Sequence, residues 1–189
     1  YDVSAACLRC GTGAVQTSPL MVPLGELPQQ GLICATHQGD FLVGERLARA
    51  LRKERVSGLE LRQVCSHSGN KRLPWWQMLA AHTMPRMDPR TKGMVHDMRP
   101  GWGCPVCERD CYEGMDEMVY ARSQVNTSVL PDVVQTWECF GRSLLHDDPK
   151  RNLARGFAQP LLLMKIRVFE IFRELKVRHA EFEPVRIVG

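Results

Sequence analysis

Two pairs of closely spaced cysteines are the residues of this chain best suited to chemistry. The first pair is Cys7 and Cys10, followed directly by Gly11, and the second pair is Cys104 and Cys107. Each C-x-x-C turn directs two sulfurs to one point, so two turns together supply four sulfurs. A tetrahedral shell of four sulfurs at about 2.3 Å is the coordination of a structural Zn2+. The sequence therefore predicts one zinc site, with Gly11 providing the positive φ that the first turn needs.

Two other interpretations of the cysteines stay open, namely disulfides and redox-active or unligated thiols. The chain has 8 cysteines in 189 residues, which is below the roughly 8–10% of a small disulfide scaffold. No apolar signal segment precedes the first pair, so we expect a reduced, cytoplasmic protein. Gly11 and Gly13 do not begin the helix that follows a thioredoxin-type motif. Cys111 is the only other cysteine close enough in sequence to compete as a metal ligand.

Length and charge limit the class of protein. A chain with 44% hydrophobic and 24% charged residues is long enough for one large or two small domains, and we expect a single compact unit over 1–189. Its apolar runs are much shorter than a membrane-spanning helix. The net charge of +4 comes from 25 basic residues interspersed with 21 acidic ones. A basic stripe of the kind that binds nucleic acid is therefore not expected.

Two segments of the chain, 41–64 and 162–185, have similar sequences when they are shifted by 121 positions. Each begins with a short apolar run, continues with apolar residues at helical spacing and ends with an apolar–charged alternation. We expect a strand–helix–strand unit in both, with Gly44 as N-cap of the first helix and Pro184 at the end or edge of the last strand. The similarity indicates either a duplicated module or two common elements with similar patterning.

The segment between these units has weaker signals. Residues 73–82 could form a short helix that begins at Pro74, whereas 129–140 could form a strand. Residues 84–103 are rich in proline, glycine and methionine and are expected to be loop. Strands and helices together give an α+β fold, with the zinc-ribbon-like pair of knuckles at 7–11 and 104–108.

Enzymatic activity is not expected. Cys65 and His67 are the nearest thiol–imidazole pair, but neighbours in sequence rarely align as nucleophile and base. The polar segment 146–148, with a histidine and two aspartates, suits metal binding and a turn before Pro149 equally well. A shell of four cysteines leaves no open position for a substrate, unlike a catalytic zinc site.

The chain resembles the double-CXXCG motif proteins, a paralogous family expanded in myxobacteria. The resemblance rests on the knuckles at 7–11 and 104–107 and on the closing pattern 161–188, which includes Glu181-Phe182-Glu183-Pro184-Val185. Glu108 stands where the second motif has glycine. Members of this family act as swarming-inhibition immunity proteins, and the resemblance implies a non-catalytic protein that binds and neutralises a cognate toxin in kin competition.

Three functions remain open: this immunity function, a zinc-ribbon nucleic-acid-binding or regulatory protein, and an enzyme or redox protein. If a partner protein binds, Trp75 and Trp76 are the residues we expect at its contact surface. Adjacent residues of a helix or strand point in different directions, so at least one of the two rings should be partly exposed. Tryptophan is also enriched at interface hot spots.

Overall fold

The fold is described from a computed structural model of the chain. The structure describes residues 1–23, 25–36, 39–68, 71–96, 103–114, 117–141 and 158–189. Within these ranges it contains two helices and eleven strands, which confirms the mixed α+β class. The elements are β1 (Met21–Val22), β2 (Ile33–Ala35), β3 (Phe41–Gly44), α1 (Glu45–Lys53), β4 (Leu59–Ser66), β5 (Arg72–Ala80), β6 (Val95–His96), β7 (Tyr112–Glu113), β8 (Met118–Ala121), β9 (Val133–Phe140), β10 (Gln159–Met164), α3 (Ile166–Glu174) and β11 (Val185–Val188).

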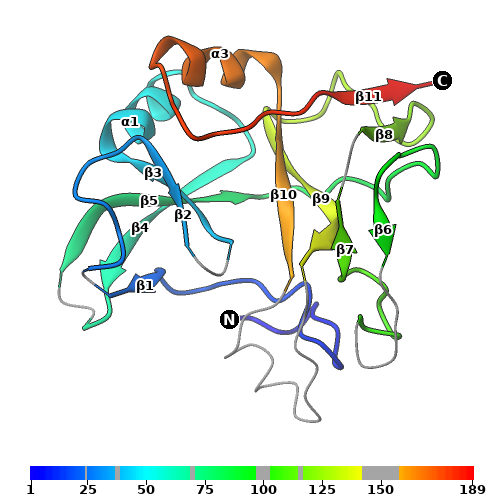
Figure 1. Cartoon of the computed structure of the whole chain (residues 1–189), viewed down its shortest axis with the longest axis horizontal. Coiled ribbons are helices and arrows are strands. Elements are labelled where there is room, and N and C mark those ends of the chain that lie inside the picture. The colour runs from blue at the N-terminus through cyan, green and yellow to red at the C-terminus, as the bar shows by residue number, and fades with distance from the viewer. Residues whose placement is uncertain (24, 37–38, 69–70, 97–102, 115–116, 142–157) are drawn as a thin grey trace.

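The strands form two larger sheets and one strand pair, with both helices on one side of the molecule (Figure 1). The first sheet has the order β1-β4-β5-β3-β2, the second has the order β10-β9-β7-β6, and β11 pairs with β8. The chain after β5 connects the two larger sheets, because the Met84 N–H donates to the Gln135 carbonyl of β9 at 2.8 Å and the Gln135 N–H donates to the His82 carbonyl at 2.9 Å. β9 therefore has backbone partners on both sides.

The prediction of a helix that begins at Pro74 is wrong, because residues 72–80 form the strand β5. Burial in the first half of this strand alternates with a period of two, with Leu73, Trp75 and Gln77 buried. β5 also pairs with β3 on one side and β4 on the other. The ladder with β4 is irregular between Gln63 and Cys65, close to Pro74, which has no N–H to donate. The strand expected within 129–140 is confirmed as β9.

The two similar segments do contain the same strand–helix unit. β3 leads directly into α1, and β10 leads through Lys165 into α3. The helices are both nine residues long and begin 121 positions apart, at Glu45 and Ile166. Their N-cap residues, Gly44 and Lys165, are both extended. The expected N-cap at Gly44 is therefore confirmed, and the two helices pack against each other.

The turns that end the two helices also match. The Val56 N–H donates to the Leu51 carbonyl at 3.2 Å, and its counterpart Val177 donates to Phe172 at 3.0 Å. This bond closes a helix end when the residue before it is left-handed. Arg55 has a φ of 48° and Lys176 has a φ of 54°, so the two turns share a conformation that glycine usually supplies.

After these turns the two segments diverge. β4 begins at Leu59, directly after the turn, and pairs with β5. In the second segment the strand expected from about residue 180 does not begin until Val185, and it pairs in parallel with β8. Residues 178–184 instead cross the face of the molecule between the two larger sheets (Figure 1). Duplication of one module as the origin of the similarity stays a hypothesis.

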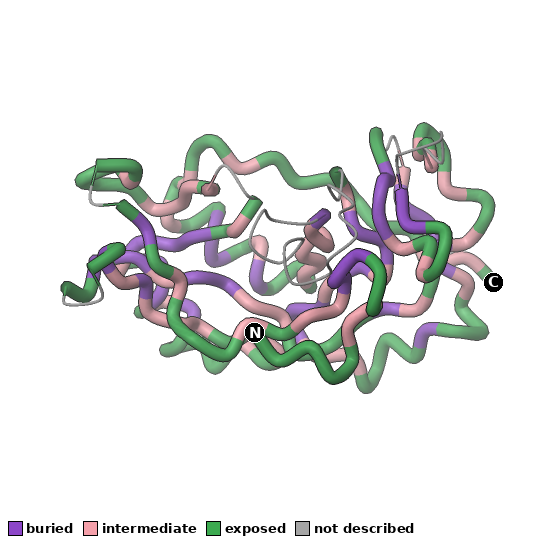
Figure 2. The backbone as a smooth tube through the Cα atoms, turned by 90° about the horizontal axis from the view of Figure 1, so that it is seen from below, coloured by how far each residue is buried: buried purple, intermediate pink, exposed green. Residues whose placement is uncertain are grey.

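Buried apolar side chains form three clusters. The first lies between the helices and both sheets and contains Leu47, Leu51 and Phe172, the second packs around Tyr120, and the third packs around Trp75. Figure 2 shows the buried segments along the strands, whereas the N-terminal residues are mostly exposed. Among the described residues, no helix combines the length and apolar composition needed to cross a bilayer.

Candidate metal centre

The four cysteines of the two knuckles meet in space. The Sγ atoms of Cys7 and Cys104 are 3.7 Å apart, and those of Cys10 and Cys107 are 3.6 Å apart. All four sulfurs lie within 4.8 Å of one another. Ligands at the corners of a tetrahedron with bonds of about 2.3 Å are separated by about 3.8 Å. The described structure therefore places the sulfurs at the spacing that a tetrahedral metal ion requires.

The first knuckle is carried by a short loop near the N-terminus. The backbones of Asp2 and Val15 exchange hydrogen bonds of 2.7 and 2.8 Å, which close this loop at its base. Within it the Gly11 N–H donates to the Cys7 carbonyl at 2.8 Å. Gly11 has a φ of 79°, which confirms the left-handed conformation expected from its place after Cys10.

The second knuckle has the same backbone conformation without a glycine. The Glu108 N–H donates to the Cys104 carbonyl at 3.1 Å, and Glu108 has a φ of 54°. The departure from the C-x-x-C-G pattern at Glu108 therefore does not change the shape of the turn. A side chain is strained in this region of backbone space, so the surrounding contacts hold Glu108 there.

Strand β9 anchors the second knuckle. The Cys139 N–H donates to the Arg109 carbonyl at 2.6 Å, and the Cys111 N–H donates to the Gly141 carbonyl at 3.0 Å. These bonds fix residues 109–111 to the end of the strand. The first knuckle has no strand of its own, and a metal ion shared by the sulfurs would bind it to the second sheet.

Polar groups around the sulfurs orient them. The Thr12 N–H donates to the Cys10 Sγ at 3.4 Å, and the Thr12 hydroxyl lies 3.1 Å from the same sulfur. On the other side, the buried Asp110 carboxylate accepts the Cys104 N–H at 2.8 Å. Groups that hold the ligands in place in this way tune metal affinity. Sequence reasoning missed Thr12 and Asp110, and closeness to the cysteines is the only signal that could have indicated them.

Two of the four ligand thiols, those of Cys10 and Cys104, have a raised pKa, which favours their neutral form. Burial raises the pKa of the Cys104 thiol to about 11. The hydrogen bond with the Cys107 thiol, together with burial, raises the pKa of Cys10. Because the thiolate is the metal ligand, binding a cation releases these protons. Metal affinity should therefore decrease as pH falls.

The four cysteine ligands limit which metal ion can bind and what role it can have. Four thiolates in a tetrahedral arrangement suit Zn2+ or iron and do not suit Mg2+ or Ca2+, which prefer oxygen. A site whose four positions are all filled by protein sulfurs is closed to water and substrate. The ligand set is therefore compatible with a structural metal centre.

The remaining cysteines and His67, all of them described residues, are not part of this cluster. All eight cysteines lie in the described ranges and none of them forms a disulfide, which does not support the disulfide interpretation. Cys111 is buried and outside the group of four, so it does not replace a ligand. Cys65 lies in β4, and the exposed His67 follows that strand. The segment 146–148 lies outside the described residues.

The two adjacent tryptophans lie on opposite faces of β5. Trp75 is only 2% exposed and donates its Nε1–H to the Pro28 carbonyl at 3.2 Å. Trp76 is half-buried, donates to Glu45 Oε2 at 2.7 Å and lies under the Arg52 guanidinium at 3.7 Å. Of the two rings, only that of Trp76 is available to a partner.

Comparison with protein-family models, with curated proteins and with solved structures finds no match for this chain.

Proposed function

We propose that the protein is a non-catalytic, zinc-stabilised immunity protein that binds and neutralises a cognate protein toxin. The observation that carries the proposal is the group of four cysteine sulfurs within 4.8 Å of one another. Such a site stabilises a fold and leaves no coordination position for a substrate. A protein built around it acts through its surface, by binding.

The tips of the two knuckles favour a protein partner over nucleic acid. Leu8, directly after Cys7, and Val106, directly before Cys107, are 84% and 69% exposed. Exposed apolar side chains beside a rigid centre suit a protein interface, whereas nucleic acid is bound mainly by lysine and arginine at phosphates. The choice of a toxin as that partner rests on the resemblance to the double-CXXCG proteins. As the metal ion we propose Zn2+, which the four thiolates fit best.

Co-expression with a neighbouring toxin tests the immunity function. Genes beside the one encoding this chain are expressed singly in a susceptible host, with and without this protein. We expect one of them to stop growth and the protein to restore it through a stable complex. Cys10→Ser should lose protection because the fold is lost, whereas Cys65→Ser, outside the metal site, should protect fully.

Two results would contradict the proposal. The first is a toxic neighbour that kills cells containing normal amounts of the folded protein. The second is tight binding to DNA or RNA that weakens steeply with salt, because that dependence marks phosphate neutralisation and would support a nucleic-acid-binding function instead.

A further inference from the structure

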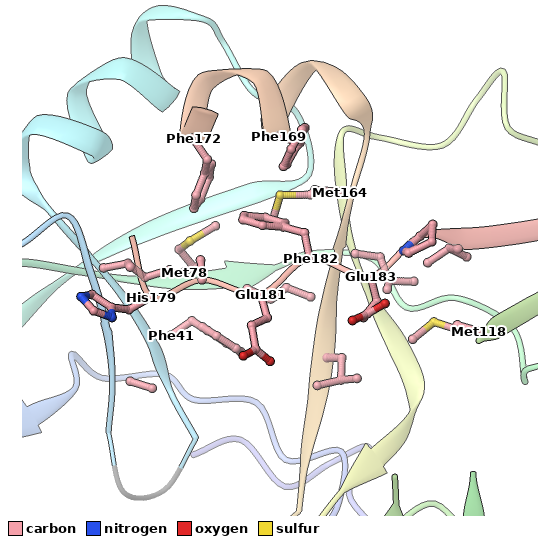
Figure 3. Close-up of a pocket in the computed structure, with 18 of the residues that line it drawn as sticks. Phe41, Met78, Met118, Met164, Phe169, Phe172, His179, Glu181, Phe182 and Glu183 are labelled. Atoms are coloured by element: carbon pink, nitrogen blue, oxygen red, sulfur yellow. The ribbon is translucent and has the colours of Figure 1, made fainter. Parts of the chain in front are cut away.

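An apolar groove lies between the two larger sheets. Its walls are the edge strands β2 and β10, and helix α3 and the C-terminal residues 179–185 complete it (Figure 3). The groove has a volume of about 1450 Å³. Small-molecule pockets are usually ~300–1000 Å³, so this space suits a larger, elongated occupant.

The backbone of β10 is unpaired on the side of the groove. The N–H groups of Gln135 and Val133 in β9 donate to His82 and Ser57, away from β10. Their partners across the ladder are Leu162 and Met164. In an antiparallel pair, two residues directly opposite one another either exchange both N–H···O=C bonds or both direct these groups outward, away from the partner strand. Leu162 and Met164 therefore direct their N–H and C=O groups away from β9, and no hydrogen bond joins them to another described segment.

This edge lacks the charges that normally prevent strand addition. β10 and the facing strand β2 contain no charged residue. Pro160 and the register shift between Pro160 and Leu162 interrupt only the first part of β10, which leaves 162–164 as a regular apolar edge. An edge of this kind is a template for an added strand.

The first strand–helix unit shows what such an edge accepts. Its strand β3 corresponds to the end of β10, and its outer edge is paired with β2. β2 is short, apolar and antiparallel to β3, with Ile33 opposite Val43 and Ala35 opposite Phe41. Among the described residues, β10 has no equivalent of β2.

The rim of the groove is acidic. Glu181 and Glu183 are exposed and line the groove, and Figure 3 shows their carboxylates on either side of β10. Neither carboxylate has an ion-pair partner among the described residues. Phe182, between them, packs edge-on against Phe169 and Phe172 at centroid distances of 5.0 and 5.5 Å. The aromatic contacts therefore hold both charges at the rim.

We propose that this groove binds an extended peptide segment of a partner protein, which adds to the edge of β10 as an antiparallel strand. The segment has apolar side chains that enter the groove and a lysine or arginine that pairs with Glu181 or Glu183. Backbone hydrogen bonds to Leu162 and Met164 supply the affinity, and the acidic rim selects the charge.

Two fluorescein-labelled peptides test the proposal by fluorescence anisotropy on the full chain. The first copies residues 31–36 with serine in place of Cys34 and a lysine at each end, and the second is a valine–threonine strand with the same lysines. We expect saturable binding of at least one of them. Replacing the lysines by glutamates should weaken it by about tenfold, since two rim ion pairs are lost.

Matched variants separate strand addition from unspecific adsorption. Glu181→Lys with Glu183→Lys should weaken binding by about tenfold, whereas Glu26→Lys with Glu54→Lys, also exposed and outside the groove, should not. Two isomers of the peptide, N-methylated at alternate amides, keep all side chains. Each isomer lacks the N–H donors along one of the two edges of the peptide strand. At least one of the two methylated isomers should lose binding.

Three outcomes would overturn the proposal. They are no saturable binding of either peptide up to about 0.5 mM, equal binding of both methylated isomers and the parent, and a stable homodimer in sedimentation that excludes the peptides. The last would show that a second copy of the chain covers the edge. None of these measurements involves the toxin, so they stand apart from the immunity function.

Discussion

Gly11 and Glu108 occupy the same position in the two knuckles and have the same left-handed backbone, with φ values of 79° and 54°. Each donates its N–H to the carbonyl of the first cysteine of its own knuckle, at 2.8 and 3.1 Å. The backbone bond that shapes the turn is therefore independent of the side chain. Glycine makes this conformation inexpensive in the first knuckle, and Glu108 adopts it under strain in the second.

Replacing Glu108 by glycine should stabilise the protein. The change removes the strain of a side chain in the left-handed region, and we expect a gain of about 0.5–1 kcal/mol in the free energy of unfolding. Urea denaturation of the metal-loaded protein measures it. Glu108→Ala serves as control, because it also loses the exposed contact with Arg86 but keeps a β-carbon. A gain with alanine equal to that with glycine would contradict the explanation from strain.

Loss of one metal ligand should destabilise the whole fold. The knuckles close a loop of roughly 90 residues, and a cross-link of that length stabilises a chain by about 4–5 kcal/mol in the entropy model. Cys10→Ser should therefore greatly lower the melting temperature measured by calorimetry. Elemental analysis should give one zinc ion per wild-type chain and less in the variant.

The control for this prediction is Cys65→Ser, a half-buried cysteine of β4 outside the cluster. It should retain the metal and change the melting temperature only slightly. A strong chelator should lower the melting temperature of the wild type to a value close to that of Cys10→Ser. An unchanged melting curve for Cys10→Ser would rule out a structural role for the metal.

Asp132 should make stability depend on acid pH. Partial burial opposes the ionised form of Asp132, but hydrogen bonds from the Ser57 N–H and hydroxyl and the charge of Arg167 outweigh it, so its pKa is lowered. A lowered pKa adds stability above the unfolded value of about 3.9, and this stability is lost as pH falls through the folded value.

Asp132→Asn should consequently cost about 1–3 kcal/mol at pH 7 and progressively less below about pH 4. Urea denaturation at pH 7 and at about pH 3 measures the difference, and the exposed Glu170→Gln is the control. The same cost at both pH values would show that the aspartate acts only through its shape.

The two tryptophans should differ in what their loss affects. Trp75→Ala removes a buried ring and should cost about 3–5 kcal/mol of stability. Trp76→Ala should cost less, because the ring is half-buried, and as a partner contact it should weaken toxin binding by about tenfold or more. Trp76→Phe, which keeps a ring under Arg52, should restore part of the binding. Full protection by Trp76→Ala would mean that this residue only supports the fold.

Features that depend on local spacing were determined by the sequence alone. A C-x-x-C turn brings its own two sulfurs together through a backbone bond between near neighbours, so the ligands at Cys7, Cys10, Cys104 and Cys107 could be predicted. Both helices were also predictable, because their apolar residues recur with the helical period within one segment.

Contacts between distant residues were decided by the tertiary structure. Residues 73–80 became a strand because β3 and β4 satisfy its backbone on both sides, and no local pattern contains those partners. The same applies to the late start of β11, which follows from its pairing with β8. The left-handed Glu108 and the open edge of β10 also depend on packing. Sequence spacing specifies which atoms are close along the chain, whereas the fold decides which sheet edges are filled and which remain free.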